Sequence, residues 1–168
     1  WNRPPEFWRE RTVIRCRKDL DYALAAGRGI LLICPHYTML EASAALLYPL
    51  LGKLEVTYRP NESRGLEELI FAGRSRYSNL INVRDLKKVI LALRSGKLVW
   101  FAPDQDMGPR GAVCADFFGE PAWTLETPAK LVRSTGSIPI FLDLRRENRT
   151  YSIAFHAFPS GYPFDDPL

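Results

Sequence analysis

The stretch Gly29–Pro49, GILLICPHYTMLEASAALLYP, contains two patterns joined by a proline. Its first six residues form an apolar run that has the length and Ile/Leu content of a buried strand. After the proline, apolar residues recur at helical spacing. We therefore predict a strand followed by a helix, with His36 in the turn between them and Glu41 in the first turns of the helix.

This arrangement allows a catalytic pair. A carboxylate on the helix can accept a hydrogen bond from the Nδ1–H of a ring in the preceding turn, which leaves Nε2 free to act as a base. We expect Glu41 to hold His36 in this way. A histidine at a strand end is also commonly just a hydrogen-bonded polar residue, so this short pattern needs support from the rest of the chain.

Composition limits the class of protein. The chain has 168 residues, 46% of them hydrophobic and 25% charged, which is typical of one globular domain. It contains no apolar run long enough to span a bilayer and no visible signal peptide. Its three widely spaced cysteines fit neither a disulfide framework nor a zinc site and favour a reducing compartment.

The chain carries a net charge of +4, and most of its basic residues are arginine. Arginine binds phosphate and carboxylate groups in a bidentate manner. The charge therefore indicates either a solvated basic surface or an anionic partner, such as a phosphorylated substrate, an acidic carrier protein or an anionic membrane face. The Trp- and Arg-rich segment 1–11 is typical of a membrane interface, but we favour a helix packed on its own domain.

Helical and extended patterns alternate along the rest of the chain, which predicts an α/β domain with a mostly parallel central sheet flanked by helices. The last two strands are expected to form an antiparallel pair at its edge or end. Asp85 is a good N-cap for the expected helix 86–95. The expected helices are 12–26, 65–76, 86–95 and 124–135, and the expected strands are 54–59, 80–83, 97–102, 137–144 and 150–158.

Three polar residues follow directly after predicted strands: His36, Arg59 and Asp104. Ligands of open α/β sheets bind outside the carboxyl ends of the strands. We therefore expect these three side chains to contribute to one site. Arg74 ends a predicted helix, where the helix dipole alone favours a cation, and His156 in a strand is expected to be structural.

The segment 103–122 lacks periodicity and is expected to be a long loop, which is usually functional or disordered. It opens with Asp104 and Asp106. These two carboxylates fit a metal site that holds a diphosphate, a pair that orients arginines around a substrate, or simple caps of local N–H groups. Phe117 and Phe118 near its end suit either an acyl pocket or an anchor to the core.

The chain lacks a Gly-rich dinucleotide fingerprint, a P-loop and a GxSxG nucleophile elbow. These absences argue against dinucleotide enzymes, P-loop nucleotide hydrolases and serine α/β-hydrolases. They also favour direct transfer over a covalent acyl-enzyme. With two histidines and no zinc-type spacing, we expect no zinc site.

Several motifs, in order along most of the chain, resemble the late acyltransferases of lipid A biosynthesis, the lauroyl/myristoyl enzymes of Gram-negative bacteria. PHYTMLE (35–41) matches their HX4(D/E) block, and DQDMGP within the 84–111 match is the more specific feature. The other matching pieces are YRP (58–60), GR (73–74), RDLKKVILALRSGKLVWFAPDQDMGPRG (84–111) and DFFGEPA (116–122).

The resemblance implies a glycerolipid-acyltransferase-like fold and transfer of a fatty acyl chain from acyl carrier protein to a hydroxyl of a lipid A precursor. It implies an enzyme of the cytoplasmic face of the inner membrane, with no metal or organic cofactor and no nucleic-acid partner. Residues 1–168 would be one catalytic domain, a fragment that lacks the N-terminal membrane helix and the C-terminal end of the family.

The family's catalytic pair maps onto His36 and Glu41, its block arginine onto Arg59, and its loop aspartate onto either Asp104 or Asp106. We expect Arg59 to stabilise the oxyanion. The expected substrate-binding set is Arg59, Arg74, Asp104, Asp106 and Arg110. Two other functions remain: a metal-dependent nucleotide-sugar glycosyltransferase that uses Asp104 and Asp106, and a non-catalytic module that binds a lipid or a carrier protein.

Overall fold

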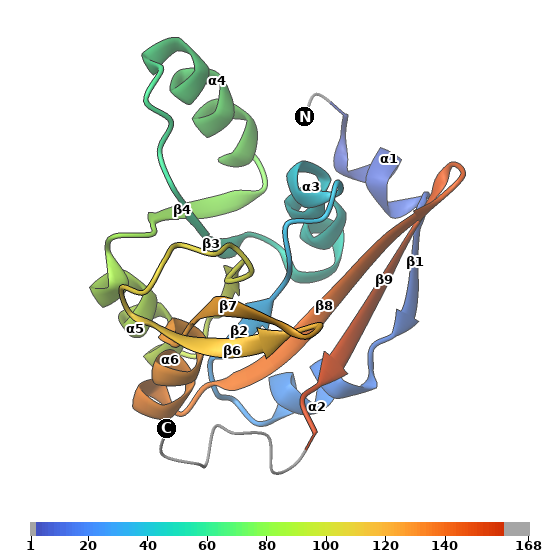
Figure 1. The fold of residues 1–168 in the computed structure, drawn as a ribbon. Helices are drawn as coiled ribbons and strands as arrows, with labels where there is room; N and C mark the ends of the chain where they lie inside the picture. Colours follow the sequence, from blue (N-terminus) through green and yellow to red (C-terminus); the bar gives the residue numbers. More distant parts are fainter. Residues whose placement is uncertain (1–2, 160–168) are drawn as a thin grey trace.

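The computed structural model describes residues 3–159, in which seven strands form one sheet in the order β1-β9-β8-β2-β5-β3-β4 (Figure 1). Two further strands, β6 and β7, form a separate hairpin. The strands are β1 (Thr12–Cys16), β2 (Ile30–Ile33), β3 (Leu54–Tyr58), β4 (Ser78–Asn82), β5 (Leu98–Phe101), β6 (Ala112–Phe117), β7 (Glu120–Leu125), β8 (Ile138–Glu147) and β9 (Thr150–Ala157).

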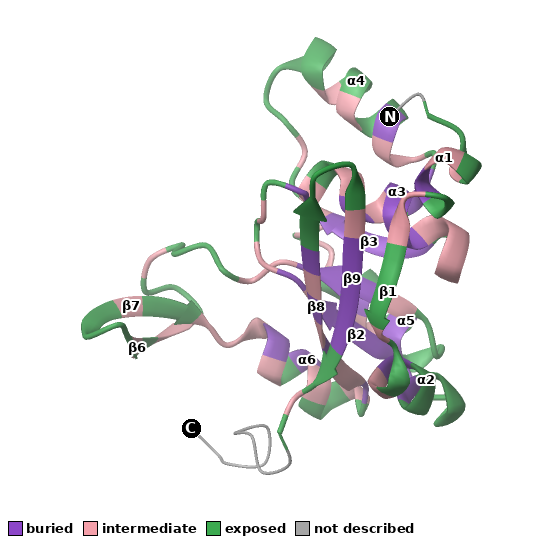
Figure 2. Cartoon of the chain, turned by 90° about the vertical axis from the view of Figure 1, so that its right-hand side faces the viewer, coloured by how far each residue is buried: buried purple, intermediate pink, exposed green. Residues whose placement is uncertain are grey.

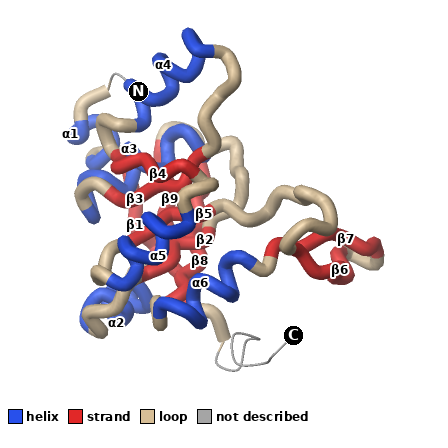
Figure 3. Tube along the Cα trace, turned by 90° about the vertical axis from the view of Figure 1, so that its left-hand side faces the viewer, coloured by secondary structure: helices blue, strands red, loops and turns tan. Residues whose placement is uncertain are grey.

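The helices of the described residues lie on both faces of this sheet (Figure 3). Apolar side chains of the first three helices pack with one face in the larger core cluster, and those of α5 and α6 pack on the other face in the smaller one. The helices are α1 (Pro5–Arg9), α2 (Lys18–Ala25), α3 (Leu40–Leu51), α4 (Arg64–Arg74), α5 (Leu86–Arg94) and α6 (Thr127–Thr135).

Strand directions confirm the predicted fold class. Strands β8, β2, β5, β3 and β4 run parallel to one another. The antiparallel pair is β8 and β9, and β1 adds to β9 in parallel at the sheet edge. Because the crossovers put helices on both faces, the central strands are buried on both sides, which explains the continuous apolar run of β2.

Strand β2 is the centre of the sheet. It is flanked by β8 and β5, and its first three residues have no exposed surface. A side chain at Gly29, just before the strand, would clash with the backbone carbonyl of Leu93 at the end of α5. Glycine there lets α5 approach the sheet closely enough to bury its apolar face.

Two local predictions are wrong. The expected helix 12–26 is a strand, β1, followed by the shorter helix α2, because the β-branched segment TVIRC pairs with β9 far along the chain. The expected loop 103–122 contains the β6–β7 hairpin, so the next helix begins at Thr127 rather than Thr124. The remaining predicted elements are observed, with ends shifted by a few residues, and Asp85 accepts the expected cap bond from Lys88 N.

The hairpin projects from the body of the domain (Figures 2 and 3). Its two-residue turn, Phe118-Gly119, has positive φ at both positions, as the right-handed strand twist requires. Phe118 is 93% exposed and its ring contacts that of Phe117. This arrangement leaves both rings in solvent, so neither of the two roles expected for them, acyl pocket or core anchor, is seen.

The N-terminal segment packs on the domain, as favoured from the sequence. Trp8 of α1 is 8% exposed and belongs to the larger core cluster with residues of α3. Residues 1–2 of that segment lie outside the described range. Within residues 3–159, none of the helices combines the length and the apolar character needed to cross a bilayer.

Candidate active site

The turn after β2 and the loop after β5 meet at the carboxyl edge of the sheet. The two strands are parallel neighbours, with Ile33 opposite Phe101, and the N–H of Cys34 extends the pairing by donating to the Phe101 carbonyl at 3.1 Å. The two chain segments therefore leave the sheet side by side. This brings His36 against Asp104, as expected for side chains that follow adjacent strands.

His36 and Asp104 share two hydrogen bonds. The backbone N–H of His36 donates to Oδ2 of Asp104 at 2.7 Å, and ring Nδ1 lies 2.7 Å from Oδ1. Both side chains are 35% exposed, so the ring is open to solvent on one side. A carboxylate at Nδ1 favours the tautomer that carries the proton there, which leaves Nε2 as an unprotonated base.

Asp104 is held in its ionised form. Partial burial opposes ionisation, but the hydrogen bonds from the backbone N–H and ring of His36 outweigh it, and the pKa of Asp104 lies below its usual value. A charged carboxylate therefore faces the ring at neutral pH. Such a group both orients an imidazole and stabilises the imidazolium that forms when Nε2 takes a proton.

The partner of Nδ1 is thus Asp104, and the prediction that Glu41 fills this position is wrong. Glu41 lies in the first turn of α3 and binds Arg74 in a bidentate ion pair, with Arg74 Nε 3.1 Å from Oε2 and Nη2 bonded to Oε1. The reason is topological. The β5 loop emerges directly beside the His36 turn, whereas α4 ends beside the start of α3 and supplies a cation there.

His36, whose ring is held by Asp104, and the Glu41–Arg74 pair line one pocket of about 160 Å³. Its polar lining residues are His36, Glu41, Tyr58, Arg74 and Gln105, together with Ser43, Thr57 and Ser78. Its apolar surface comes from α3 and from strands β3 and β5, through Leu40, Ala44, Val56, Trp100, Phe101 and Ala102. A concave site with apolar walls and a few polar groups that converge is the usual form of a binding pocket.

Tyr58 and Gln105 are pocket residues that sequence reasoning missed. Both are adjacent to residues that it singled out, Arg59 and Asp104, so the signal was present in the same motifs. Tyr58 donates to Glu67 at 3.3 Å, and burial together with this carboxylate raises the pKa of its phenol. It therefore stays protonated at neutral pH.

The other predicted site residues lie elsewhere. Arg59 and Arg110 are exposed and do not line this pocket. Asp106 accepts hydrogen bonds from the backbone N–H groups of Gly108 at 2.8 Å and Trp123 at 3.4 Å. It therefore caps the loop and the base of the hairpin, which is the simplest of the three roles considered for it. Asp104 and Asp106 therefore bond to different groups, His36 and the loop backbone.

Two other groups bear on the chemistry. Cys34 lies two residues before His36, but burial raises the pKa of its thiol to about 12, which keeps it from acting as a nucleophile. His156 is exposed on β9 in a separate groove, beside Asp143 and Arg145.

In the described part of the chain, no three His, Cys, Asp or Glu side chains are grouped so that they could hold a metal ion.

Comparison with known proteins points to the acyltransferases of lipid A biosynthesis. The family model for bacterial lipid A biosynthesis acyltransferases matches residues 1–167. A lipid A biosynthesis lauroyltransferase of Escherichia coli strain K12 is 31% identical over 172 residues, which cover 95% of this chain and 55% of the relative. A lipid A biosynthesis palmitoleoyltransferase of the same strain is 30% identical, over 88% of this chain and 49% of the relative.

A lipid A biosynthesis acyltransferase of Haemophilus influenzae is 36% identical over a shorter region, 68% of this chain and 38% of the relative. The chain spans about half the length of the curated relatives it matches. The matched regions include the pocket residues, because the family model extends over almost the whole sequence.

Proposed function

The chain belongs to the bacterial lipid A biosynthesis acyltransferase family, and on that premise we propose that it transfers a fatty acyl chain from the thioester of acyl carrier protein to a hydroxyl of a lipid A precursor. The observation that carries the proposal is the His36–Asp104 pair at the pocket. It provides a base whose side chain is partly exposed and whose Nδ1 is held by a carboxylate.

In the proposed reaction, Nε2 of His36 takes the proton of the acceptor hydroxyl while its oxygen attacks the thioester carbonyl. The tetrahedral intermediate then expels the thiolate, which recovers the proton from the imidazolium. The products are the ester and the free thiol of the carrier protein. A positioned base of this kind contributes about 10²–10⁴ in rate.

Arg74 is our candidate for stabilising the oxyanion, in place of Arg59, because Arg74 lines the pocket and Arg59 does not. Glu41 holds the guanidinium through its Nε and Nη2 atoms. In this proposal Glu41 contributes to catalysis as the residue that positions Arg74 rather than the ring. Arg59 and Arg110, both exposed, are proposed to bind phosphate groups of the acceptor.

The reaction needs no metal or organic cofactor, and we place it at the cytoplasmic face of the inner membrane, within a single catalytic domain. A metal-dependent glycosyltransferase is the weaker proposal. It requires Asp104 and Asp106 to share one cation, whereas both oxygens of Asp104 are bonded to His36 and both oxygens of Asp106 accept backbone bonds.

The test is an acyl-transfer assay on this chain with acyl carrier protein thioester and a lipid A precursor. The His36→Ala variant should lose at least about 10²-fold in rate, and the matched His156→Ala variant should keep the wild-type rate. Transfer by His36→Ala at the wild-type rate would contradict the proposal. Loss of activity on chelation would favour the glycosyltransferase, and binding without turnover by the wild type would favour a binding module.

A further inference from the structure

Helix α4 stands away from the body of the domain, and part of its apolar surface is uncovered (Figures 1 and 2). Leu66 is 45% exposed and Leu69 is 61% exposed. Residues three apart lie on the same face of a helix, so these two leucines are neighbours. Gly65 and Ala72, also exposed, extend the face without adding charge. We call these four residues the α4 apolar stripe.

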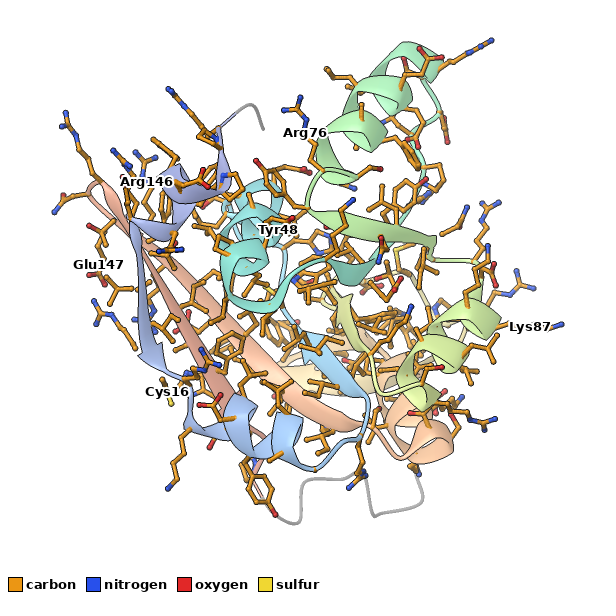
Figure 4. The ribbon with its side chains drawn as sticks, turned by 180° about the vertical axis from the view of Figure 1, so that it is seen from behind. Cys16, Tyr48, Arg76, Lys87, Arg146 and Glu147 are labelled. Carbon is orange, nitrogen blue, oxygen red and sulfur yellow. The ribbon has the colours of Figure 1, made fainter. Side chains whose placement is uncertain are left out.

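The segment 59–76, which contains the stripe, has four arginines and three glutamates, so its net charge is +1. Both acids of α4 are already bound: Glu68 pairs with Arg64 at 3.1 Å, and Glu67 accepts from Tyr58 and from the Asn61 N–H. Arginines lie on either side of the helix in sequence. Arg59 precedes it and is exposed. Arg76, also exposed, follows it at the foot of the helix (Figure 4).

The stripe is also close to the pocket. Arg74, in the last turn of α4, is the residue that lines the pocket and pairs with Glu41. Whatever covers the stripe therefore lies on the helix whose last turn lines the pocket. A short amphipathic helix with uncovered leucines and basic neighbours matches the chemistry of an anionic bilayer surface, which offers apolar chains below a layer of phosphates.

We propose that the α4 apolar stripe inserts into the surface of an anionic lipid bilayer and holds the pocket mouth against it. The choice of a bilayer rests in part on the proposed function, because the acceptor of that reaction is itself a lipid. The exposed rings at the tip of the β6–β7 hairpin are a less suitable contact, because Asp116 and Glu120 beside them would be repelled by anionic headgroups.

The test measures binding of the 168-residue chain to phosphatidylglycerol-rich vesicles by sedimentation, with vesicles of phosphatidylcholine alone for comparison. The wild type should bind the anionic vesicles more tightly, and added salt should weaken the binding. Substituting both leucines, Leu66→Gln with Leu69→Gln, should lower vesicle affinity by about tenfold or more.

The matched control is Leu91→Gln on α5, because Leu91 is 63% exposed against 61% for Leu69. It should change vesicle affinity by less than about twofold. A gain-of-affinity variant guards against simple misfolding: Leu69→Trp should tighten binding by several-fold, about the effect expected of an interfacial tryptophan, whereas Leu91→Trp should not.

The proposal is overturned if the wild type binds neither vesicle, or if the α4 and α5 variants behave alike. It is also overturned if the α4 variant alters only self-association, measured by analytical ultracentrifugation, since a second copy would then cover the stripe. Vesicle binding needs no turnover, so His36→Ala should bind like the wild type. Loss of acyl transfer in His36→Ala with unchanged vesicle binding by the α4 variant would refute this inference alone.

Discussion

At the carboxyl edge of the sheet, side chains far apart in the sequence hold one another, whereas the β6–β7 hairpin is held by near neighbours in the chain. Asp104 and His36 are 68 residues apart, and Arg74 and Glu41 are 33 apart. In the hairpin, the paired strands are joined by a two-residue turn, and Asp116 accepts from the Gly119 N–H three residues later.

The two regions therefore depend to different degrees on the rest of the fold. The pocket depends on the whole sheet being folded, because each of its ion pairs joins two separate elements. The hairpin is exposed and adds little to either core cluster. Substitutions in the two regions should therefore have clearly different effects, and the following predictions compare them.

The largest expected effect comes from Asp104, with Asp106 two residues away as its matched control. Asp104→Asn keeps the shape but removes the charge that holds the ring tautomer, so the acyl-transfer rate should fall by about 10³-fold. Asp106→Asn should change the rate by less than about threefold, because Asp106 only caps backbone groups of the loop. Equal losses in the two variants would contradict the separation of their roles.

A core substitution tests the difference in stability. Leu142 on β8 has no exposed surface, so Leu142→Ala should lower the free energy of unfolding by about 3 kcal/mol. Phe117 on the hairpin is 65% exposed, and Phe117→Ala should lower it by less than about 0.5 kcal/mol. Urea unfolding followed by circular dichroism measures both values, and a larger loss for Phe117→Ala would show that the hairpin packs on the body.

A third comparison concerns the ion pair between Glu41 and Arg74. Glu41→Gln should release Arg74 and lower kcat by about tenfold or more with little change in stability, because a misplaced cation stabilises the transition state less well. The control is Glu68→Gln, whose partner Arg64 is on the exposed part of α4. A change confined to KM would instead indicate that Arg74 binds the ground state of the substrate.

The smallest effect is a dependence of stability on pH. Because the pKa of Asp104 is lower in the folded state than in the unfolded one, its ionised form stabilises the fold. This contribution is fully present above about pH 4, the usual carboxylate range, and is lost as the pH falls through the lower folded-state pKa. The stability difference between wild type and Asp104→Asn should be about 1 kcal/mol near neutral pH.

Measuring that difference by urea unfolding at about pH 7 and again at about pH 3 tests the sign. The difference should shrink at the lower pH. A difference that is constant or larger in acid would mean that Asp104 is not preferentially ionised in the folded protein.

The sequence predicts most of the central fold because its patterns are local. The strand and helix within Gly29–Pro49 follow from two clear periods, and the cap at Asp85 follows from residue type. Strand β1 is not predicted in this way, because the strand with which it pairs, β9, begins at Thr150, far along the chain. The sequence does not predict the β6–β7 hairpin, because its turn has Phe118 at a position where Asn or Gly is usual.

The candidate site was predicted in part. That His36 and Asp104 lie at the same edge follows from their positions after strands. That they bond to each other depends on β2 and β5 being neighbours in the sheet, which a single sequence does not specify. The same gap explains why the sequence points to Glu41, close along the chain, as the partner of the ring, and why it does not predict that Arg74 pairs with Glu41.

The central claim is that Asp104 fixes the proton on Nδ1 of His36 and leaves Nε2 as the base. Nitrogen-15 NMR of the ring nitrogens tests it directly, since the chain has only one other histidine, His156, as an internal reference. For the neutral ring, we predict a protonated Nδ1 and an unprotonated Nε2 at His36, and a shift toward the other tautomer in Asp104→Asn. A proton on Nε2 in the wild type, or spectra unchanged by Asp104→Asn, would contradict the account.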